Sequence, residues 1–170
     1  QQKSNRIISL EKQKSDDLLR NILPNEVALE LKESGKALAR NYDEVTVLFT
    51  DFVDFTKFSE KSSPQQLVSE LHACFKAFDE IMERHGLEKI KTIGDAYMAV
   101  SGLPLPNVQH ARNAALAAID IQQYIKHRQR TQPEVFDIRI GLNSGPVVAG
   151  IVGVKKFAYD IWEEHTSELQ

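Results

Sequence analysis

The fold is decided by one stretch of the chain, KIKTIGDAYMAV at residues 89–100. Both halves are rich in apolar and β-forming residues, and they meet at Gly94-Asp95. The stretch therefore predicts two strands, Leu87 to Ile93 and Ala96 to Val100, joined by a tight turn. That turn leaves the carboxylate of Asp95 at one end of the pair of strands.

A second acid, Asp51, ends another β-rich run, VLFTDFVDFT at residues 47–56. We expect Val45 to Phe49 to form a strand, and the backbone N–H groups of Phe52 to Thr56 to lie at a helix start where they could cradle a polyphosphate. Neighbouring first and second strands would bring Asp51 and Asp95 together. Two carboxylates at one rim form a hard-oxygen site for Mg²⁺ or Mn²⁺, which indicates phosphate chemistry.

The polyphosphate segment is made of Phe52, Val53, Asp54, Phe55 and Thr56. Asp54 has two interpretations, as the N-cap of a helix from Phe55 or as a metal ligand, and we favour the N-cap. Lys91 also has two. A lysine in mid-strand usually faces solvent, and its functional interpretation is a donor to a base or phosphate.

The remaining pattern completes the fold. It predicts a helix from Pro64 to Gly86, a helix over His110 to Arg128, a strand over Phe136 to Leu142, a turn at Asn143 to Pro146, and a partner strand over Val147 to Val154. We therefore predict an α+β fold of the ferredoxin-like split βαβ type (βαββαβ). Its sheet is antiparallel with helices on one face.

Residues 1–43 are predicted to be a helical linker. A weak heptad seam through Ile8, Leu18 and Ile22 is compatible with a dimeric coiled coil and with a solvated helix. A second helix over 24–34 would end at Gly35, and 36–43 read as connecting chain. The chain starts at Gln1 without a signal peptide, so we expect an upstream sensor or membrane region in the parent protein, and a cytoplasmic catalytic domain.

Composition narrows the function classes. The 170 residues are 42% hydrophobic with a net charge of −3, which supports a core and gives no nucleic-acid footprint. The single cysteine, Cys74, allows no internal disulfide and is predicted to be a small apolar residue on a helix face. Neither GxGxxG nor a P-loop occurs, and the histidines lack metal-ligand spacing.

Four ordered runs now point to a family: FTDFVDFT, KIKTIGDAYMAV, RIGLNSGPVVAGIVG and FAYDIW. Over residues 44–162 they resemble the catalytic domain of class III nucleotidyl cyclases. The NILPNEV segment before them is similar to the helical lead-in of such domains. The GG[DE]EF signature of diguanylate cyclases is absent.

The resemblance implies a head-to-tail homodimer with composite active sites. In it, Asp51 and Asp95, with the backbone carbonyl of Phe52, match the groups that bind two divalent cations, Mg²⁺ or Mn²⁺. Lys91 and Asp160, supplied by the other subunit, match the pair that reads the purine. Lysine can donate to adenine N1 and aspartate can accept from the N6 amino group, whereas guanine presents the opposite pattern. The implied reaction makes cyclic AMP and pyrophosphate from ATP.

The chain also departs from the family. The Asn and Arg that stabilise the transition state would fall on Ser167 and one place beyond Gln170, so neither is present. Residues 163–170 have no family character, and back-translation gives a string resembling a sequencing adapter; we interpret them as a non-native tail. We expect little cyclase activity from this chain, since each loss can cost on the order of 10²-fold in rate. The alternatives are a non-catalytic nucleotide-binding dimerisation domain and a guanylate cyclase.

Overall fold

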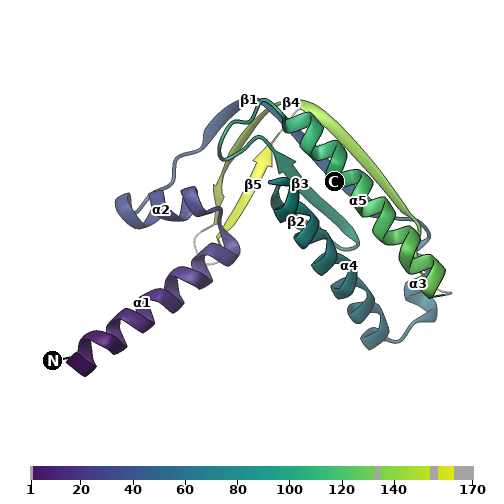
Figure 1. Cartoon of the computed structure of the whole chain (residues 1–170), viewed down its shortest axis with the longest axis horizontal. Helices are drawn as coiled ribbons and strands as arrows, with labels where there is room; N and C mark the ends of the chain where they lie inside the picture. The colour runs from purple at the N-terminus through teal and green to yellow at the C-terminus, as the bar shows by residue number, and fades with distance from the viewer. Residues whose placement is uncertain (1, 133–134, 154–156, 163–170) are drawn as a thin grey trace. The chain divides into compact units, whose positions relative to one another are not determined.

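The computed structural model describes residues 2–132, 135–153 and 157–162, so the predicted tail at 163–170 lies outside the described residues. Contacts divide the chain into two compact units. One is Tyr42–Val147, and the other combines Gln1–Asn41 with Val148–Gln170. The elements, labelled in Figure 1, are α1 (Gln2–Ile22), α2 (Asn25–Ser34), β1 (Arg40–Phe52), α3 (Phe55–Lys61), α4 (Pro64–His85), β2 (Glu88–Ile93), β3 (Ala96–Ser101), α5 (His110–Thr131), β4 (Ile138–Val152) and β5 (Ala158–Trp162).

The strands follow the hydrogen-bonded order β2-β3-β1-β4-β5. Strand β3 runs antiparallel to both β2 and β1, which confirms the predicted α+β, ferredoxin-like arrangement. One expectation was wrong: the first and second strands are not neighbours, because β3 lies between them. The β2–β3 hairpin folds back so that its second strand pairs with β1.

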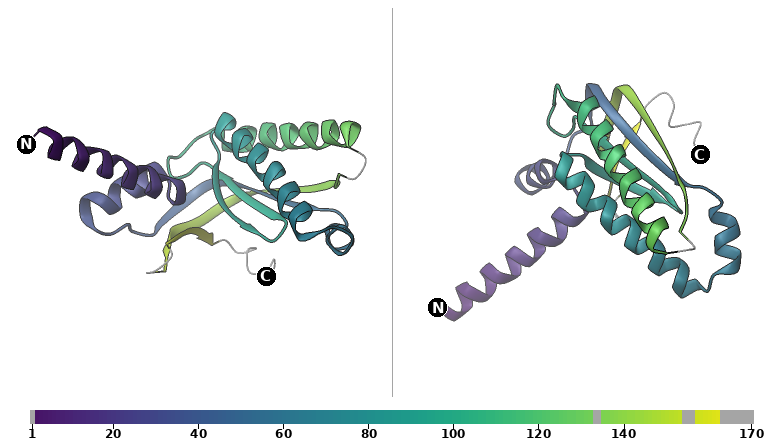
Figure 2. Two further views of the ribbon diagram at one scale, coloured as in Figure 1. Left: turned by 90° about the horizontal axis from the view of Figure 1, so that it is seen from below. Right: turned by 45° about the vertical axis from the view of Figure 1, so that its right-hand side comes forward.

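Within Tyr42–Val147, helices α4 and α5 lie side by side over one face of the sheet (Figure 2). We call this the helix face. Leu48 and Phe52 of β1 join Tyr97 and Ala99 of β3 in the core beneath the helices. Side chains alternate along a strand, so Asp51 points to the other side, which we call the opposite face.

The ends of α4 show why sequence patterns located it well. Ser63 and Gln66 form a reciprocal capping box, and Pro64 occupies the first turn, where its missing N–H costs nothing. Gly86 ends the helix in the left-handed conformation at φ 72°. The prediction for this helix is confirmed, as is that for Cys74. That residue is fully buried, and burial raises the pKa of its thiol to about 12.

Two strands are longer than predicted. Strand β1 begins at Arg40 within the segment read as connecting chain, and β4 runs without a break through Asn143 to Pro146, where we predicted a turn. The Ser144 hydroxyl bonds to the Thr46 hydroxyl at 2.7 Å, so β1 offers this polar run a partner. The hairpin instead joins β4 to β5, with Val148 opposite Trp162 and Val152 opposite Ala158.

The other unit begins with α1 and α2, linked by an ion pair of 2.6 Å between Lys32 and Asp16. This contact lowers the pKa of Asp16. The predicted coiled-coil positions Ile8, Leu18 and Ile22 are 60%, 68% and 54% exposed, and the coiled coil stays a prediction. No helix among the described residues is both long and apolar enough to span a membrane.

One contact between α4 and α5 gives a pH-dependent prediction. The Asp120 carboxylate lies 2.6 Å from His85 Nε2 and 3.1 Å from Arg84 Nη1, and these bonds lower its pKa below the usual 3.8. A lowered carboxyl pKa stabilises the fold above the unfolded value, and the effect disappears as pH falls through the folded value. We expect Asp120→Asn to cost less than about 1 kcal/mol near neutral pH. In urea unfolding at a series of pH values, this difference should shrink below pH 3.8; a constant difference would contradict it.

Candidate active site

The structure brings Asp51 and Asp95 together at one end of the β1–β3 pair. Thr50, just before Asp51, pairs with Tyr97, and Asp95 comes just before β3. The Asp95 carboxylate accepts a hydrogen bond of 3.3 Å from the Phe52 backbone N–H, and the Asp51 carboxyl lies close enough to raise the pKa of Asp95. The acids therefore meet, as the sequence predicts, but through β3 rather than through adjacent first and second strands.

The electrostatics of this pair favour a cation. Burial, followed by the nearby Asp51 carboxyl, raises the pKa of Asp95. Two carboxylates that repel each other and supply hard oxygen atoms are a donor set that suits Mg²⁺ or Mn²⁺. The residues present thus fit the implied metals. Among the residues that the structure describes, no group of three or more His, Cys, Asp or Glu side chains gathers, so a cation here would also need backbone, water or substrate oxygens.

Arg139 is a member of the site that sequence reasoning missed. Its Nη2 donates to Asp51 Oδ2 at 2.6 Å, although both side chains are well exposed. The signal was available in the alternation Ile138-Arg139-Ile140, because the two isoleucines pack against the core and turn Arg139 to the opposite face. Only the strand order, which places β4 beside β1, brings it to Asp51.

Aromatic side chains pack against the segment that follows Asp51. Phe52 is 2% exposed, and the centroid of its ring lies 4.8 Å from the centroid of the Phe136 ring. The rings of Phe55 and Phe58 in α3 pack against the same Phe136 ring, with centroid distances of 5.7 and 4.4 Å. The phenylalanines of the FTDFVDFT run therefore anchor the turn between β1 and α3, which limits how far Asp51 can move.

The predicted polyphosphate segment has fewer open amides than expected. The Phe52 N–H is bound to Asp95 and the Val53 N–H to the Asp137 carbonyl, at 2.9 Å. This leaves the backbone amides of Asp54 to Thr56 as the candidates for binding a polyphosphate. Asp54 occupies the N-cap position, as predicted, but in the left-handed region at φ 57°. Its side chain makes no capping bond and pairs with Lys57 at 3.3 Å.

The two residues expected to read the purine lie in different units. Lys91 is partly buried on β2 and pairs with Met98, which places it on the opposite face. Asp160 lies on β5, opposite Gly150, in the other unit. Their roles stay predictions.

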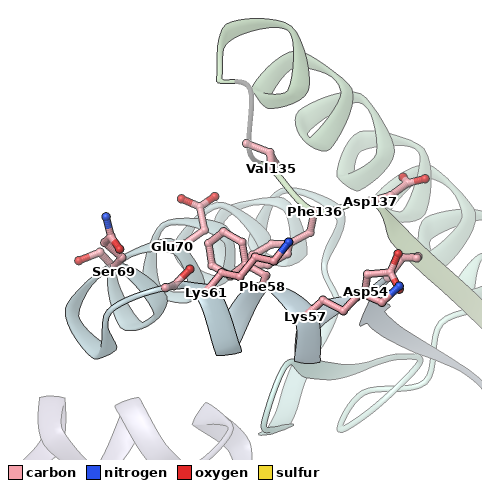
Figure 3. Close-up of a pocket in the computed structure, with 12 residues that line it drawn as sticks. Asp54, Lys57, Phe58, Lys61, Ser69, Glu70, Val135, Phe136 and Asp137 are labelled. Atoms are coloured by element: carbon pink, nitrogen blue, oxygen red, sulfur yellow. The ribbon is translucent and has the colours of Figure 1, made fainter.

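A surface pocket lies beside α3 and the start of α4, and Figure 3 shows the side chains that line it. It takes in Val53 and Asp54 but neither Asp51 nor Asp95. Its lining mixes acids and lysines around two aromatic rings: Val53, Asp54, Lys57, Phe58, Lys61, Ser62, Gln66, Ser69, Glu70, Val135, Phe136 and Asp137. This mixture does not single out an anion or a cation.

Comparison with known proteins identifies the family. The adenylate and guanylate cyclase catalytic domain matches residues 38–167, so the chain belongs to that family and is a nucleotidyl cyclase catalytic domain. An adenylate cyclase of Mycobacterium bovis is 41% identical over 157 residues, 92% of this chain and 35% of the relative. The receptor-type guanylate cyclase gcy-5 of Caenorhabditis elegans is 41% identical over 158 residues, 89% of this chain and 14% of the relative. The chain thus spans about a third or less of these relatives.

Solved structures agree. The catalytic core of a rhodopsin–guanylyl cyclase with converted specificity, in complex with ATPαS, is 38% identical. Its TM-score is 0.71, and the match covers 76% of this chain and 71% of that one. The guanylate cyclase domain of RhGC from Catenaria anguillulae, in complex with GTP, is also 38% identical with a TM-score of 0.70, covering 74% and 69%.

The raised pKa of Asp95 gives a prediction of opposite sign to that for Asp120. A carboxyl with a raised folded pKa loses its stability contribution as pH rises through that value, so its ionised form destabilises the fold at neutral pH. We expect Asp95→Asn to raise the free energy of unfolding at pH 7 and to have no effect below pH 3.8. Urea unfolding with EDTA present measures this; destabilisation at pH 7 would contradict it.

The Arg139–Asp51 ion pair should compete with a bound cation. Arg139→Met removes the competing charge, and exposed pairs contribute about 0.2–1 kcal/mol, so Mn²⁺ should bind about 1.4-fold to fivefold more tightly without nucleotide. Titration followed by the EPR signal of free Mn²⁺ measures this. Lys57→Met, which breaks the Asp54 pair instead, is the matched control and should change nothing. Weaker Mn²⁺ binding by Arg139→Met would rule out competition.

Proposed function

We propose that this domain converts ATP to 3′,5′-cyclic AMP and pyrophosphate at sites formed by a homodimer. The observation that carries the proposal is the convergence of Asp51 and Asp95 beside the β1–α3 turn. Family membership gives the reaction class, and the relatives include both adenylate and guanylate cyclases.

The metal-binding part of the site uses Asp51, Asp95 and the backbone carbonyl of Phe52. Two divalent cations held there would lower the pKa of the ribose 3′-hydroxyl and neutralise charge on the phosphate oxygens. The chain's own residues act around them. Arg139 donates to Asp51 in this structure, and with that carboxylate engaged in holding a cation its guanidinium would be available to bind phosphate oxygens. The amides of Asp54 to Thr56 add donors at the start of α3.

Base selection is the finer part of the proposal. Lys91 can donate to adenine N1, and Asp160 can accept from its N6 amino group. A guanylyl cyclase whose specificity was converted has been solved with ATPαS, and a guanylate cyclase domain with GTP, which supports the view that this fold accepts either base. The choice of ATP therefore depends on a few side chains, and here we assign it to Lys91 and Asp160.

Dimerisation is proposed because the resemblance assigns the metal-binding and base-reading groups of one site to different subunits. Among the similar solved structures are a dimeric and a monomeric guanylyl cyclase domain of Blastocladiella emersonii. The exposed apolar positions of α1 offer a second contact between two copies. Sedimentation measured with and without Mn²⁺ and nucleotide would test this part.

A binding experiment tests the base preference. With saturating Mn²⁺, calorimetry should give a dissociation constant for ATP at least about tenfold lower than for GTP, the difference that one or two good hydrogen bonds supply. The double exchange Lys91→Glu with Asp160→Cys should reverse the preference. Asp51→Asn should weaken the binding of ATP and of GTP by the same factor, since it alters metal binding and not recognition of the base.

Two outcomes would contradict the proposal. An ATP preference unchanged by the double exchange would remove the roles of Lys91 and Asp160. In a domain extended through the Asn and Arg of the family pattern, faster production of cyclic GMP from GTP than of cyclic AMP from ATP would identify a guanylate cyclase instead.

A further inference from the structure

Two lysines on β2 sit two positions apart yet belong to opposite faces of the sheet. Residues two apart on a regular strand share a face. Here Lys89 pairs with Ala99 but Lys91 pairs with Met98, so a β-bulge at Ile90 shifts the register by one residue. Ala99 belongs to the core beneath the helices, which puts Lys89 on the helix face and Lys91 on the opposite face.

Asp79 of α4 binds Lys89, the residue of the bulge that lies on the helix face. Its carboxylate lies 2.9 Å from Lys89 Nζ and accepts a bond of 2.7 Å from the Tyr97 hydroxyl. The Lys89 ammonium also lies over the Tyr97 ring, 5.2 Å from its centre. Tyr97 is fully buried, so this three-residue contact ties β2 and β3 to a fixed point on the helix.

The contact exists only while the bulge exists. Residues 91–93 are held in register by the hairpin turn, where Ile93 pairs with Ala96. If the bulge were lost, Lys89 would move opposite Val100 and turn to the face that carries Lys91. It would then be out of reach of Asp79, and two ammonium groups would stand about 7 Å apart on one face. Asp79 therefore stabilises the register that keeps Lys89 away from Lys91.

We propose that Asp79 is a positioning residue for nucleotide selection: by binding Lys89 and Tyr97 it maintains the bulge at Ile90 and so sets the place and surroundings of Lys91. The proposal deepens the function proposed above and rests on it for the role of Lys91. Asp79 itself touches neither substrate nor metal. It acts from the helix face, on the far side of the sheet from the residue that it positions.

The first measurement needs no nucleotide. Asp79→Ala should raise the hydrogen-exchange rate of the backbone amides of residues 88–92 about tenfold relative to the rest of the sheet. Lys89→Met should do the same, whereas Lys89→Arg, which keeps the charge, should preserve protection. Asp120→Asn, an acid on α5 that bonds to Arg84 and His85 rather than to Lys89 or Tyr97, is the control and should leave these amides unchanged.

The second measurement is the ratio of the dissociation constants for GTP and ATP with saturating Mn²⁺. Asp79→Ala and Lys89→Met should lower this ratio at least threefold, while Lys89→Arg and Asp120→Asn keep the wild-type ratio. A loss of overall stability alone would weaken the binding of both nucleotides and leave the ratio of the two dissociation constants unchanged. Asp79→Asn gives a milder second variant, because its amide can still accept from Tyr97.

The outcomes separate the two proposals. Unchanged exchange at residues 88–92 in Asp79→Ala would overturn the positioning role whatever the nucleotide results. Altered exchange with an unchanged ratio would overturn it as well, because the bulge would then not influence selection. A wild-type chain with no preference for ATP would instead remove the adenine assignment. In that case the exchange data alone decide whether Asp79 maintains the bulge.

Discussion

Two like charges held side by side are the constraint on which the site depends. Asp51 and Asp95 meet only because β3 pairs with β1, so the sheet order sets their distance. Their repulsion is offset by Arg139 and by the backbone N–H of Phe52. The buried Phe52–Phe136 contact keeps the turn from relaxing away. Such a pair is unfavourable without a cation, and charged groups gathered against their mutual repulsion are typical of functional sites.

The sheet separates two tasks. The helix face carries the core that stabilises the domain, and the opposite face carries Asp51, Arg139 and Lys91. Asp79 connects the two, because a carboxylate on the helix side helps to decide which lysine reaches the other side. Substitutions in α4 can therefore alter chemistry on a surface that the helix does not touch.

Local patterns predicted much of this architecture and failed where distant partners decide. Capping residues located α4, and apolar runs around Gly94-Asp95 located the β2–β3 hairpin, because these signals lie within a few residues of the structure that they specify. Asn143 to Pro146 has the composition of a turn, yet a long neighbouring strand pairs with it. Arg139 and the bulge at Ile90 were missed for the same reason: each depends on contacts between residues far apart in the chain.

The single cysteine has a practical consequence for studying the assembly. Cys74 is fully buried with a thiol pKa of about 12, so labelling reagents that need an exposed thiolate should leave it alone. A cysteine introduced on the surface would then be the one thiol that such reagents modify. Spin or fluorescent labels placed there could report distances between two copies, without first removing a natural cysteine from the core.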